Sequence, residues 1–309
     1  MYKVDHCLAC GSGEVISYPA VMSSFVASYV LNRDPELTRL FECTGCSFRF
    51  FEDRYDSREV AALYLDYRGD EYFSSRHGCE PWYTKKMNDT IGKDPVEIQT
   101  RKAKLSGFIS AYVDPARLST VLDYGGDKGQ FIPDQLGSAR FVYDISKVEP
   151  VPGVVSLFEK SDVADNRFDL VMLCHVLEHC SEPLQVLAEL KALAAKRGTL
   201  FCFEVPFEMY DLKFVPKSKR YEEYLKVVTG LKPLARALDF YSTVARVKFN
   251  VVPPLGFVKL HEHVNFFSVA SMRALLERAG FEVRGCEVVT GEGFRFPSTV
   301  MCLAEAREH

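Results

Sequence analysis

Two pairs of cysteines lie near the amino terminus, and their spacing is that of metal-binding knuckles. Cys7 and Cys10 form the first pair, and Cys43 and Cys46 form the second. Each Cys-x-x-Cys pair can place two thiolates on one tetrahedral ion, and Zn²⁺ is the usual ion in such sites. Four thiolates leave no coordination position open, so the spacing predicts structural rather than catalytic zinc. The alternative is a set of four unligated core cysteines.

A second motif is a glycine-rich turn that follows an apolar run ending in Asp123. The glycines are Gly125, Gly126 and Gly129. This pattern predicts a buried strand, a tight turn and the beginning of a helix. Glycines let a ligand approach the backbone, the helix would offer free N–H groups, and the acid can accept hydrogen bonds. We therefore expect a nucleotide-type site, with an ordinary strand-to-helix turn as the alternative.

Two common nucleotide motifs do not fit this turn. The dinucleotide fingerprint Gly-x-Gly-x-x-Gly fails because Asp127 and Gln130 stand where glycine is needed. The Walker pattern fails as well. These departures argue against a nicotinamide enzyme and against an NTPase.

Two further acids follow the turn. Asp144 ends the short apolar run 140–144, about twenty residues past the glycines, where an α/β nucleotide fold places the carboxylate that holds ribose hydroxyls. Asp162 lies beyond a candidate strand at 153–157, near where related folds contact adenine, and a helix cap explains it equally well. The sequence thus predicts Asp144 as the ribose ligand.

Composition limits the class of protein. The chain has 309 residues, 47% of them hydrophobic, so it can bury a sizeable core and form two units. A net charge of -4 and a pI near 6.0 argue against a large nucleic-acid footprint. No signal peptide and no run near ~18 apolar residues is visible, so we expect a cytoplasmic protein without a membrane or nucleic-acid partner. The cysteines outside the two pairs are expected to be reduced and buried.

Strands and helices alternate over most of the chain, and they would position these groups in an α/β fold with a mostly parallel sheet. The predicted elements are a helix over 95–112, strands over 140–144, 153–157, 168–174 and 199–205, a helix from Pro183, a helix over 269–279, and strands over 281–289 and 298–306. Residues 55–84 are dense in aromatic and cationic side chains. Such a segment is more often core than a ligand site, although a cover over a site is the alternative.

The glycine turn resembles the first motif of class I S-adenosylmethionine-dependent methyltransferases, Asp-x-Gly-x-Gly-x-Gly. Asp123, Gly125 and Gly129 are in register with it, and Asp127 replaces the middle glycine. The runs Phe-Asp-Leu-Val, at 168–171, and His-Val-Leu-Glu-His, at 175–179, extend the resemblance, which covers 119–206 and resumes at 261–305. With the paired cysteines ahead of it, the chain is most similar to bacterial sugar methyltransferases.

This resemblance implies a Rossmann-like, mixed seven-stranded sheet with helices on both faces, a small zinc ribbon and a helical lid insertion. The expected parts are a zinc-binding module at 1–53, an aromatic and helical connecting region at 54–115, and a methyltransferase domain at 116–309 with an insertion at 206–260. The expected cofactors are S-adenosylmethionine and structural zinc. The residues implied at the cofactor site are Asp123, Gly125, Gly126, Gly129, Asp144, Asp162 and His175.

The insertion 206–260 is basic in an acidic chain, with ten Lys or Arg and five acids. A local basic surface predicts a small anionic substrate, such as a nucleotide-linked sugar or a related precursor of a polysaccharide or secondary metabolite. The alternative is a helical lid whose charged side chains only face solvent. A zinc-ribbon RNA methyltransferase or RNA binder is a rival function, although residues 2–53 are not conspicuously basic. A non-catalytic cofactor-binding scaffold is another, because Asp127 breaks the glycine motif.

The resemblance also implies a catalytic pair, since sugar C-methyltransferases place Glu-His before an aromatic-Phe-Ser sequence, as Glu262 and His263 stand here. An imidazole can take a proton from a carbon acid or a hydroxyl, and Glu262 could orient the ring. We therefore predict His263 as the general base, with His261 and His175 in reserve. Leu260 stands where a tyrosine is expected, which argues against C-methylation and leaves O-methylation open. The sequence does not decide between carbon, oxygen and nitrogen as the methylated atom. A purely structural role for His263 is the alternative.

Overall fold

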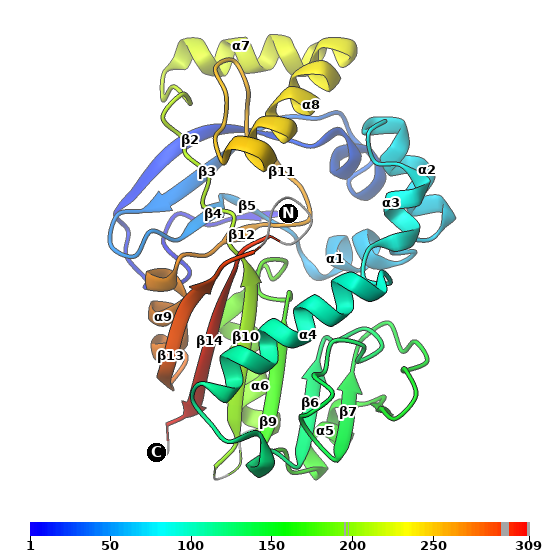
Figure 1. Ribbon diagram of the computed structural model, residues 1–309. Helices are drawn as coiled ribbons and strands as arrows, with labels where there is room; N and C mark the ends of the chain where they lie inside the picture. Colours follow the sequence, from blue (N-terminus) through cyan, green and yellow to red (C-terminus); the bar gives the residue numbers. More distant parts are fainter. Residues whose placement is uncertain (195, 197, 292–296, 308–309) are drawn as a thin grey trace. The chain divides into compact units, whose positions relative to one another are not determined.

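The computed structural model describes residues 1–194, 196, 198–291 and 297–307. The chain forms two compact units, each with its own sheet (Figure 1). The first unit comprises Met1–Cys7, Gly11–Lys93 and Glu208–Phe266, and the second comprises Leu8–Cys10, Asp94–Phe207 and Phe267–His309. Compactness does not test which segments fold independently, so the boundaries expected after residues 53 and 115 stay a prediction.

A seven-stranded sheet forms the centre of the second unit, in the order β13-β14-β10-β9-β6-β7-β8. The strands are β6 Thr120–Tyr124, β7 Ala139–Tyr143, β8 Val155–Leu157, β9 Leu170–Cys174, β10 Leu200–Pro206, β13 Phe281–Val289 and β14 Thr299–Ala306. Neighbours from β10 to β8 pair in parallel, whereas β14 pairs antiparallel with β10 and with β13. The predicted mixed, mostly parallel α/β sheet is confirmed.

Helices cover both faces of this sheet (Figure 1). They are α4 Pro95–Ser110, α5 Lys160–Asp165, α6 Pro183–Ala194 and α9 Val269–Arg278, with a short 3₁₀ turn at Pro115–Arg117. Successive strand residues face opposite layers, so Leu200 and Cys202 join the core that includes α4. Phe201 and Phe203 face the other way, with ring centroids 5.1 and 5.5 Å from that of Phe281.

The helix expected directly after the glycine turn is absent. Residues 125–138, which join β6 to β7, form only turns and bends. The segment is short, Gly129 and Gly137 both have φ near +70° (70° and 72°), and Pro133 has no N–H to donate. The prediction of a helix amino terminus at this site was therefore wrong.

The first unit is built on a five-stranded sheet of order β11-β2-β3-β4-β12. Strands β1 and β5 form a separate two-stranded sheet. The strands are β1 Tyr2–Lys3, β2 Val15–Met22, β3 Leu37–Cys43, β4 Arg49–Phe51, β5 Asp53–Arg54, β11 Lys259–Leu260 and β12 Asn265–Phe266. The helices are the π-helix Val26–Val30, α1 Ser57–Tyr64, α2 Asp70–Cys79, α3 Lys85–Thr90, α7 Lys219–Gly230 and α8 Lys232–Phe249. The insertion thus supplies two helices and an edge strand.

Three segments far apart in sequence share the core of this unit. Phe25 lies between the two cysteine pairs, Tyr72 comes from the aromatic segment, and Leu225 and Val258 come from the insertion. All four are fully buried. Tyr55 and Tyr83 are buried too. The interpretation of residues 55–84 mainly as core is confirmed for these tyrosines.

The expectation that the cysteines outside the two pairs are reduced was wrong for two of them. Cys286 and Cys302 form a disulfide between β13 and β14, with their Cα atoms 4.1 Å apart. They face each other across an antiparallel pair, a geometry that sequence separation alone did not reveal.

Candidate functional site

The four paired cysteines converge in the structure. Their sulfur atoms all lie within 4.8 Å of one another, and the Sγ atoms of Cys7 and Cys46 are 3.6 Å apart. Zinc–sulfur bonds of about 2.3 Å in a tetrahedron would place sulfur atoms about 3.8 Å apart, so this donor set fits a structural zinc ion.

The backbone explains why each pair forms a knuckle. Gly11 N donates to Cys7 O at 2.8 Å, and Ser47 N donates to Cys43 O at 2.9 Å, so each Cys-x-x-Cys closes in the same i to i+4 turn. Gly11 and Ser47 both have positive φ, 83° and 59°, which ends each turn sharply.

The glycine turn of the second unit requires at least two of its glycines. Gly125 has φ +77°, and a Cβ there would lie 2.7 Å from Cγ2 of Val176. A Cβ on Gly126 would collide with the carboxylate of Asp123. Asp127, which replaces the usual middle glycine, has φ 54°. Aspartate is one of the few residues that tolerate this conformation, so the departure from the motif keeps the turn.

Asp144 connects this turn to the end of β7. Its carboxylate accepts from Asp127 N at 2.9 Å, from Ser146 N at 2.8 Å and from Ser146 Oγ at 2.6 Å. A carboxylate has about four acceptor positions, so capacity for ligand hydroxyls remains. Asp162 instead accepts from Phe158 N and Glu159 N and closes the capping box of α5, which is the alternative role considered for it.

Asp123 is a buried acid of the second unit, and its Oδ1 atom has no hydrogen-bond partner. Burial raises the pKa of Asp123 to about 7; Arg101 opposes the shift, and Asp144 and Glu204 add to it. An unpartnered carboxylate oxygen at the carboxyl end of β6 fits a ligand that brings a hydrogen-bond donor or a positive charge. The glycine turn and Asp123 therefore fit S-adenosylmethionine, which carries both.

His175 lies in an ionic cluster at the ends of β9 and β10. Its Nδ1 is 3.2 Å from Glu178 Oε1, and its Nε2 is 3.7 Å from Glu204 Oε2. Arg101 donates to the same Glu204 oxygen at 2.8 and 2.7 Å. Burial and Arg101 lower the pKa of His175, but Glu204 and Glu178 outweigh them and the net shift is upward. Despite burial, Arg101 and His175 lower the pKa of Glu204 to about 2.

In the first unit, His263 pairs with a carboxylate that the sequence did not single out. Its Nδ1 lies 2.6 Å from Glu208 Oε2. Glu262, the expected orienting acid, is held by Tyr72 Oη and by Arg76 Nη1, the latter at 3.1 Å. The arrangement leaves His263 a candidate base with Glu208 as its orienting partner.

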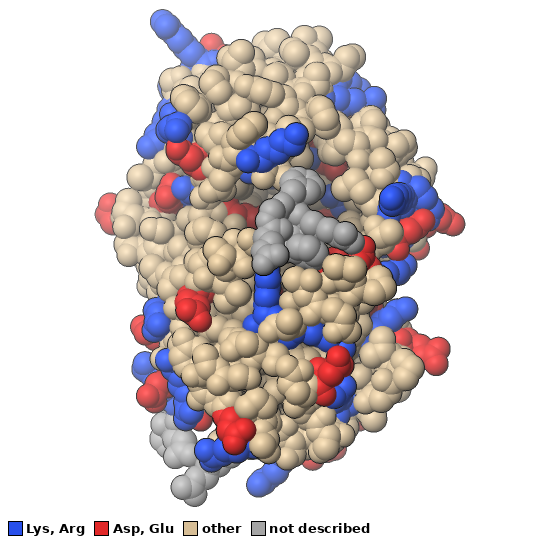
Figure 2. All heavy atoms as spheres, viewed as in Figure 1, with Lys and Arg blue, Asp and Glu red and all other residues tan. Residues whose placement is uncertain are grey.

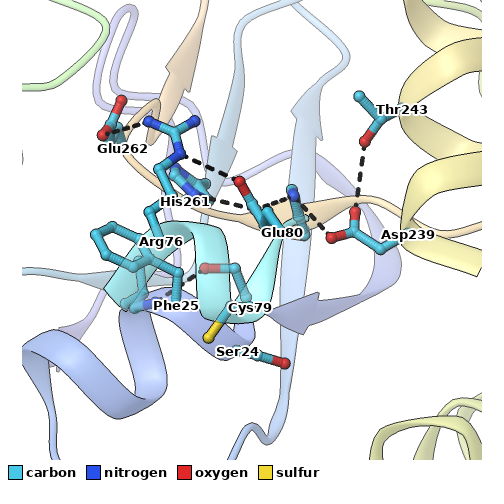
Figure 3. Close-up of polar contacts among 12 residues, drawn as sticks. Ser24, Phe25, Arg76, Cys79, Glu80, Asp239, Thr243, His261 and Glu262 are labelled. Carbon is cyan, nitrogen blue, oxygen red and sulfur yellow. Dashed lines mark hydrogen bonds and ion pairs between the residues drawn. The ribbon is translucent and has the colours of Figure 1, made fainter. Parts of the chain in front are cut away.

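His261 belongs to a buried ionic chain that Figure 3 shows in close-up. Its Nε2 is 3.3 Å from Glu80 Oε1, and Glu80 also pairs with Lys259 and with Arg76. Burial lowers the pKa of His261, and the attraction of Glu80 does not fully offset it. A neutral, packed ring tied to structural ion pairs is a poor reserve base.

Sequence reasoning did not single out Arg101, Glu204, Glu208, Tyr72, Arg76, Glu80 or Lys259. One signal was present for three of them, because Tyr72, Arg76 and Glu80 follow one another at i, i+4 spacing and so share a helix face. The ion-pair and hydrogen-bond partners of Arg101, Glu204, Glu208 and Lys259 lie far away in the sequence, so no local pattern indicated them.

The comparisons with known proteins agree with this arrangement. A family model described as a methyltransferase domain matches residues 97–284. No curated protein matches the sequence. Among the helices of the described residues, none combines the length and apolar character that a membrane span requires.

Several solved structures are similar in part. Magnesium protoporphyrin IX methyltransferase from Synechocystis PCC 6803 is 18% identical, with a TM-score of 0.36 over 68% of this chain and 83% of that one. The N,N-8-amino-8-demethyl-D-riboflavin dimethyltransferase from Streptomyces davawensis is 13% identical, with a TM-score of 0.41 over 79% and 62%. An S-adenosylmethionine-dependent methyltransferase from Mesorhizobium loti is 13% identical, with a TM-score of 0.37 over 65% and 97%. Likenesses this low carry no argument about the acceptor.

Proposed function

The chain belongs to the S-adenosylmethionine-dependent methyltransferases, and we propose that its acceptor is a small anionic molecule, such as a nucleotide-linked sugar or a related polysaccharide or secondary-metabolite precursor. In such a reaction the acceptor would attack the electrophilic methyl group of the donor in line, and the bond between that carbon and the sulfonium sulfur would break as S-adenosylhomocysteine leaves. The protein's part in such a reaction is to align the reactants, exclude water and accept a proton where the acceptor loses one.

The observation that carries the anionic acceptor is the distribution of charge in residues 206–260. Four of the five acids there are already paired: Asp211 with Lys213, Glu222 with Arg39, Asp239 with Lys259, and Glu208 with His263. Within the described residues, no carboxylate lies within ion-pair distance of Lys217, Lys219, Arg220, Lys226, Lys232 or Lys248. Lys and Arg side chains project from the surface over α7 and α8 (Figure 2). This uncompensated positive charge would attract an anion and disfavour a cationic substrate.

For the donor, we propose that the glycine turn holds S-adenosylmethionine. Asp144 would accept hydrogen bonds from the ribose hydroxyls, because it already stands at the end of β7 against the turn. Asp123 would face the positively charged amino acid end, because its buried oxygen lacks a donor. His175 and Asp162 stay predictions at the edges of this site.

For the proton, we propose His263 as general base and Glu208 as its positioning residue. A carboxylate on Nδ1 favours the tautomer with the proton on that nitrogen, so Nε2 carries the lone pair that can accept a proton. Zinc on the four cysteines would stabilise the fold and take no part in the reaction.

The test is product formation with matched acceptors. S-adenosylhomocysteine release is measured with a set of free sugars and with the same sugars as nucleoside-diphosphate derivatives. We expect kcat/KM to be at least about tenfold higher for the charged member of a productive pair, the scale of one or two charge-assisted hydrogen bonds. Equal rates for both members would refute an anionic acceptor. Methylation of short RNA in preference to every sugar would favour the RNA methyltransferase instead.

A further inference from the structure

A polar pocket in the first unit is lined by none of the residues discussed as cofactor ligands or base. Its volume is about 400 Å³, within the range of small-molecule sites. Its floor is formed by Tyr18, Glu42 and Arg49, and its wall by the segment 211–217. We propose that this pocket binds the phosphate or diphosphate group of the acceptor. The identification of the occupant as the acceptor rests on the proposed function.

The floor follows from the register of the sheet. Glu42 pairs with Arg49 across β3 and β4, and with Ile16 across β3 and β2. Tyr18 is two residues from Ile16, so alternation places Tyr18, Glu42 and Arg49 on one face of the sheet. Along β2 and β3, one end of this face packs in the apolar core, and the other end lines the charged pocket.

The wall is rigidly anchored although it carries exposed lysines. Leu212 and Val215 are buried in the core of the unit. Asp211 N donates to Asn250 O at 2.8 Å, and Val252 N donates to Asp211 O at 2.9 Å. Lys213 and Lys217 therefore extend from a fixed backbone, which lowers the entropy lost when they hold a ligand.

Arg49 connects the floor to the residue that directly precedes the wall. It is 8% exposed, its Nη1 donates to Tyr210 O at 2.5 Å, and its Nη2 donates to Glu42 Oε1 at 3.2 Å. Its Nε has no hydrogen-bond partner. A buried guanidinium fixed in this way contributes positive potential to the pocket without needing to move.

The charge of the pocket favours an oxyanion. Glu42 is paired with Arg49, and Asp211 is paired with Lys213 at 3.1 Å. The charges of these four side chains therefore cancel. Lys217 adds a further positive charge, and its Nζ lies 4.7 Å from the centre of the Tyr18 ring. A phosphate group would bring the negative charge that Lys217 lacks, and Lys213 could turn toward it on its flexible stem.

Calorimetry of the 309-residue chain, prepared with zinc, with inorganic pyrophosphate tests the site. We expect binding at low salt that Lys213→Gln with Lys217→Gln weakens about tenfold. The control Arg58→Gln with Lys86→Gln removes the same charge from exposed positions of the same unit and should leave affinity nearly unchanged. Glu42→Gln removes a negative charge from the pocket and should tighten pyrophosphate binding, whereas damage to the fold would weaken it.

Absence of pyrophosphate binding, or equal losses in the pocket and control variants, would overturn the site. The link to the acceptor is tested separately with any diphosphate-linked sugar that is turned over. The pocket variants should raise its KM and leave kcat unchanged, and an unchanged KM would overturn this inference while the proposed function stands. If no anionic acceptor is turned over, the proposed function fails, and pyrophosphate binding still decides whether the pocket is an oxyanion site.

Discussion

His263 Nδ1 lies 2.6 Å from Glu208 Oε2, although 55 positions separate the two residues. The pair joins the start of the segment after β10 to the segment between β11 and β12. A histidine held by a carboxylate on one nitrogen can serve as a general base, because the carboxylate stabilises the imidazolium that forms when the ring takes up a proton.

The first prediction concerns this pair. His263→Asn should lower kcat by about 10²–10⁴-fold with S-adenosylmethionine affinity unchanged, since general-base catalysis contributes on that scale. Glu208→Gln should lower kcat less and move the acidic limb of the pH–rate profile to lower pH, because the imidazolium loses its stabilising carboxylate. A kcat within a few-fold of the parent for His263→Asn would leave only the structural role.

The second prediction follows from Asp123, whose pKa is raised to about 7. Between pH ~4 and ~7 the folded protein keeps a proton that the unfolded chain has released, so this group makes stability fall as pH rises through that window. A cationic ligand against Asp123 prefers the ionised form. Binding of S-adenosylmethionine should therefore be about tenfold tighter near pH 8 than near pH 6. The affinity of Asp123→Asn for S-adenosylmethionine, measured by calorimetry, should lack this pH dependence. Titration of the ligand's own groups affects both proteins equally, so the comparison isolates Asp123. Equal pH dependence would contradict the placement.

The third prediction concerns the ribose ligand. Asp144→Ala should weaken S-adenosylmethionine binding by about 1–3 kcal/mol, the scale for hydrogen bonds to a charged group. Because Asp144 also fixes the turn through Asp127 N, Ser146→Ala is the matched control. It removes one hydrogen bond to Asp144 and keeps the carboxylate, so affinity should change little. Similar losses in the two variants would indicate that the turn, and not the ribose contact, was disturbed.

The sequence was sufficient for the elements that local patterns specify. The continuous apolar run that became β9 is buried at all five positions. The helix expected over 269–279 forms as α9, and Gly280, with φ +82°, follows it. The knuckles were equally predictable, because Cys-x-x-Cys spacing is a local property. The turn after β6 was not, because the glycines that indicated a ligand site also removed the preference for a helix, and Pro133 reinforced that effect.

The candidate site was predictable only in part, because its partners are distant in sequence. Tyr72 and Glu262 are separated by 190 positions, and Arg101 and Glu204 by 103. Periodicity reports which face of an element is buried, but it does not report which buried charge meets which. The adjacent residues Glu262 and His263 looked like a pair, yet each has a carboxylate or cation partner brought by another part of the fold.

The fourth prediction concerns stability. Arg76 is 3.1 Å from Glu262 Oε1 through Nη1 and 3.1 Å from Glu80 Oε2 through Nε. Arg76→Met leaves two buried carboxylates without this cation and should lower the free energy of unfolding by about 3 kcal/mol, measured by urea denaturation. Lys85→Met removes an exposed pair with Asp89 and serves as the control, with an unchanged midpoint expected. Equal midpoints for both variants would contradict the prediction.

The last prediction concerns the metal. Four thiolates within 4.8 Å of one another should bind one Zn²⁺ per chain, and the binding free energy should appear as stability of the fold. Chelation should therefore lower the thermal midpoint, and metal analysis should show loss of zinc from Cys43→Ser with Cys46→Ser. Cys79→Ser changes a half-buried cysteine outside the cluster and should keep full zinc content. Since zinc would hold the two knuckles and not the donor, the chelated protein should lose stability before it loses affinity for S-adenosylmethionine. Freshly prepared protein without zinc, or full zinc content in the double variant, would disprove the site.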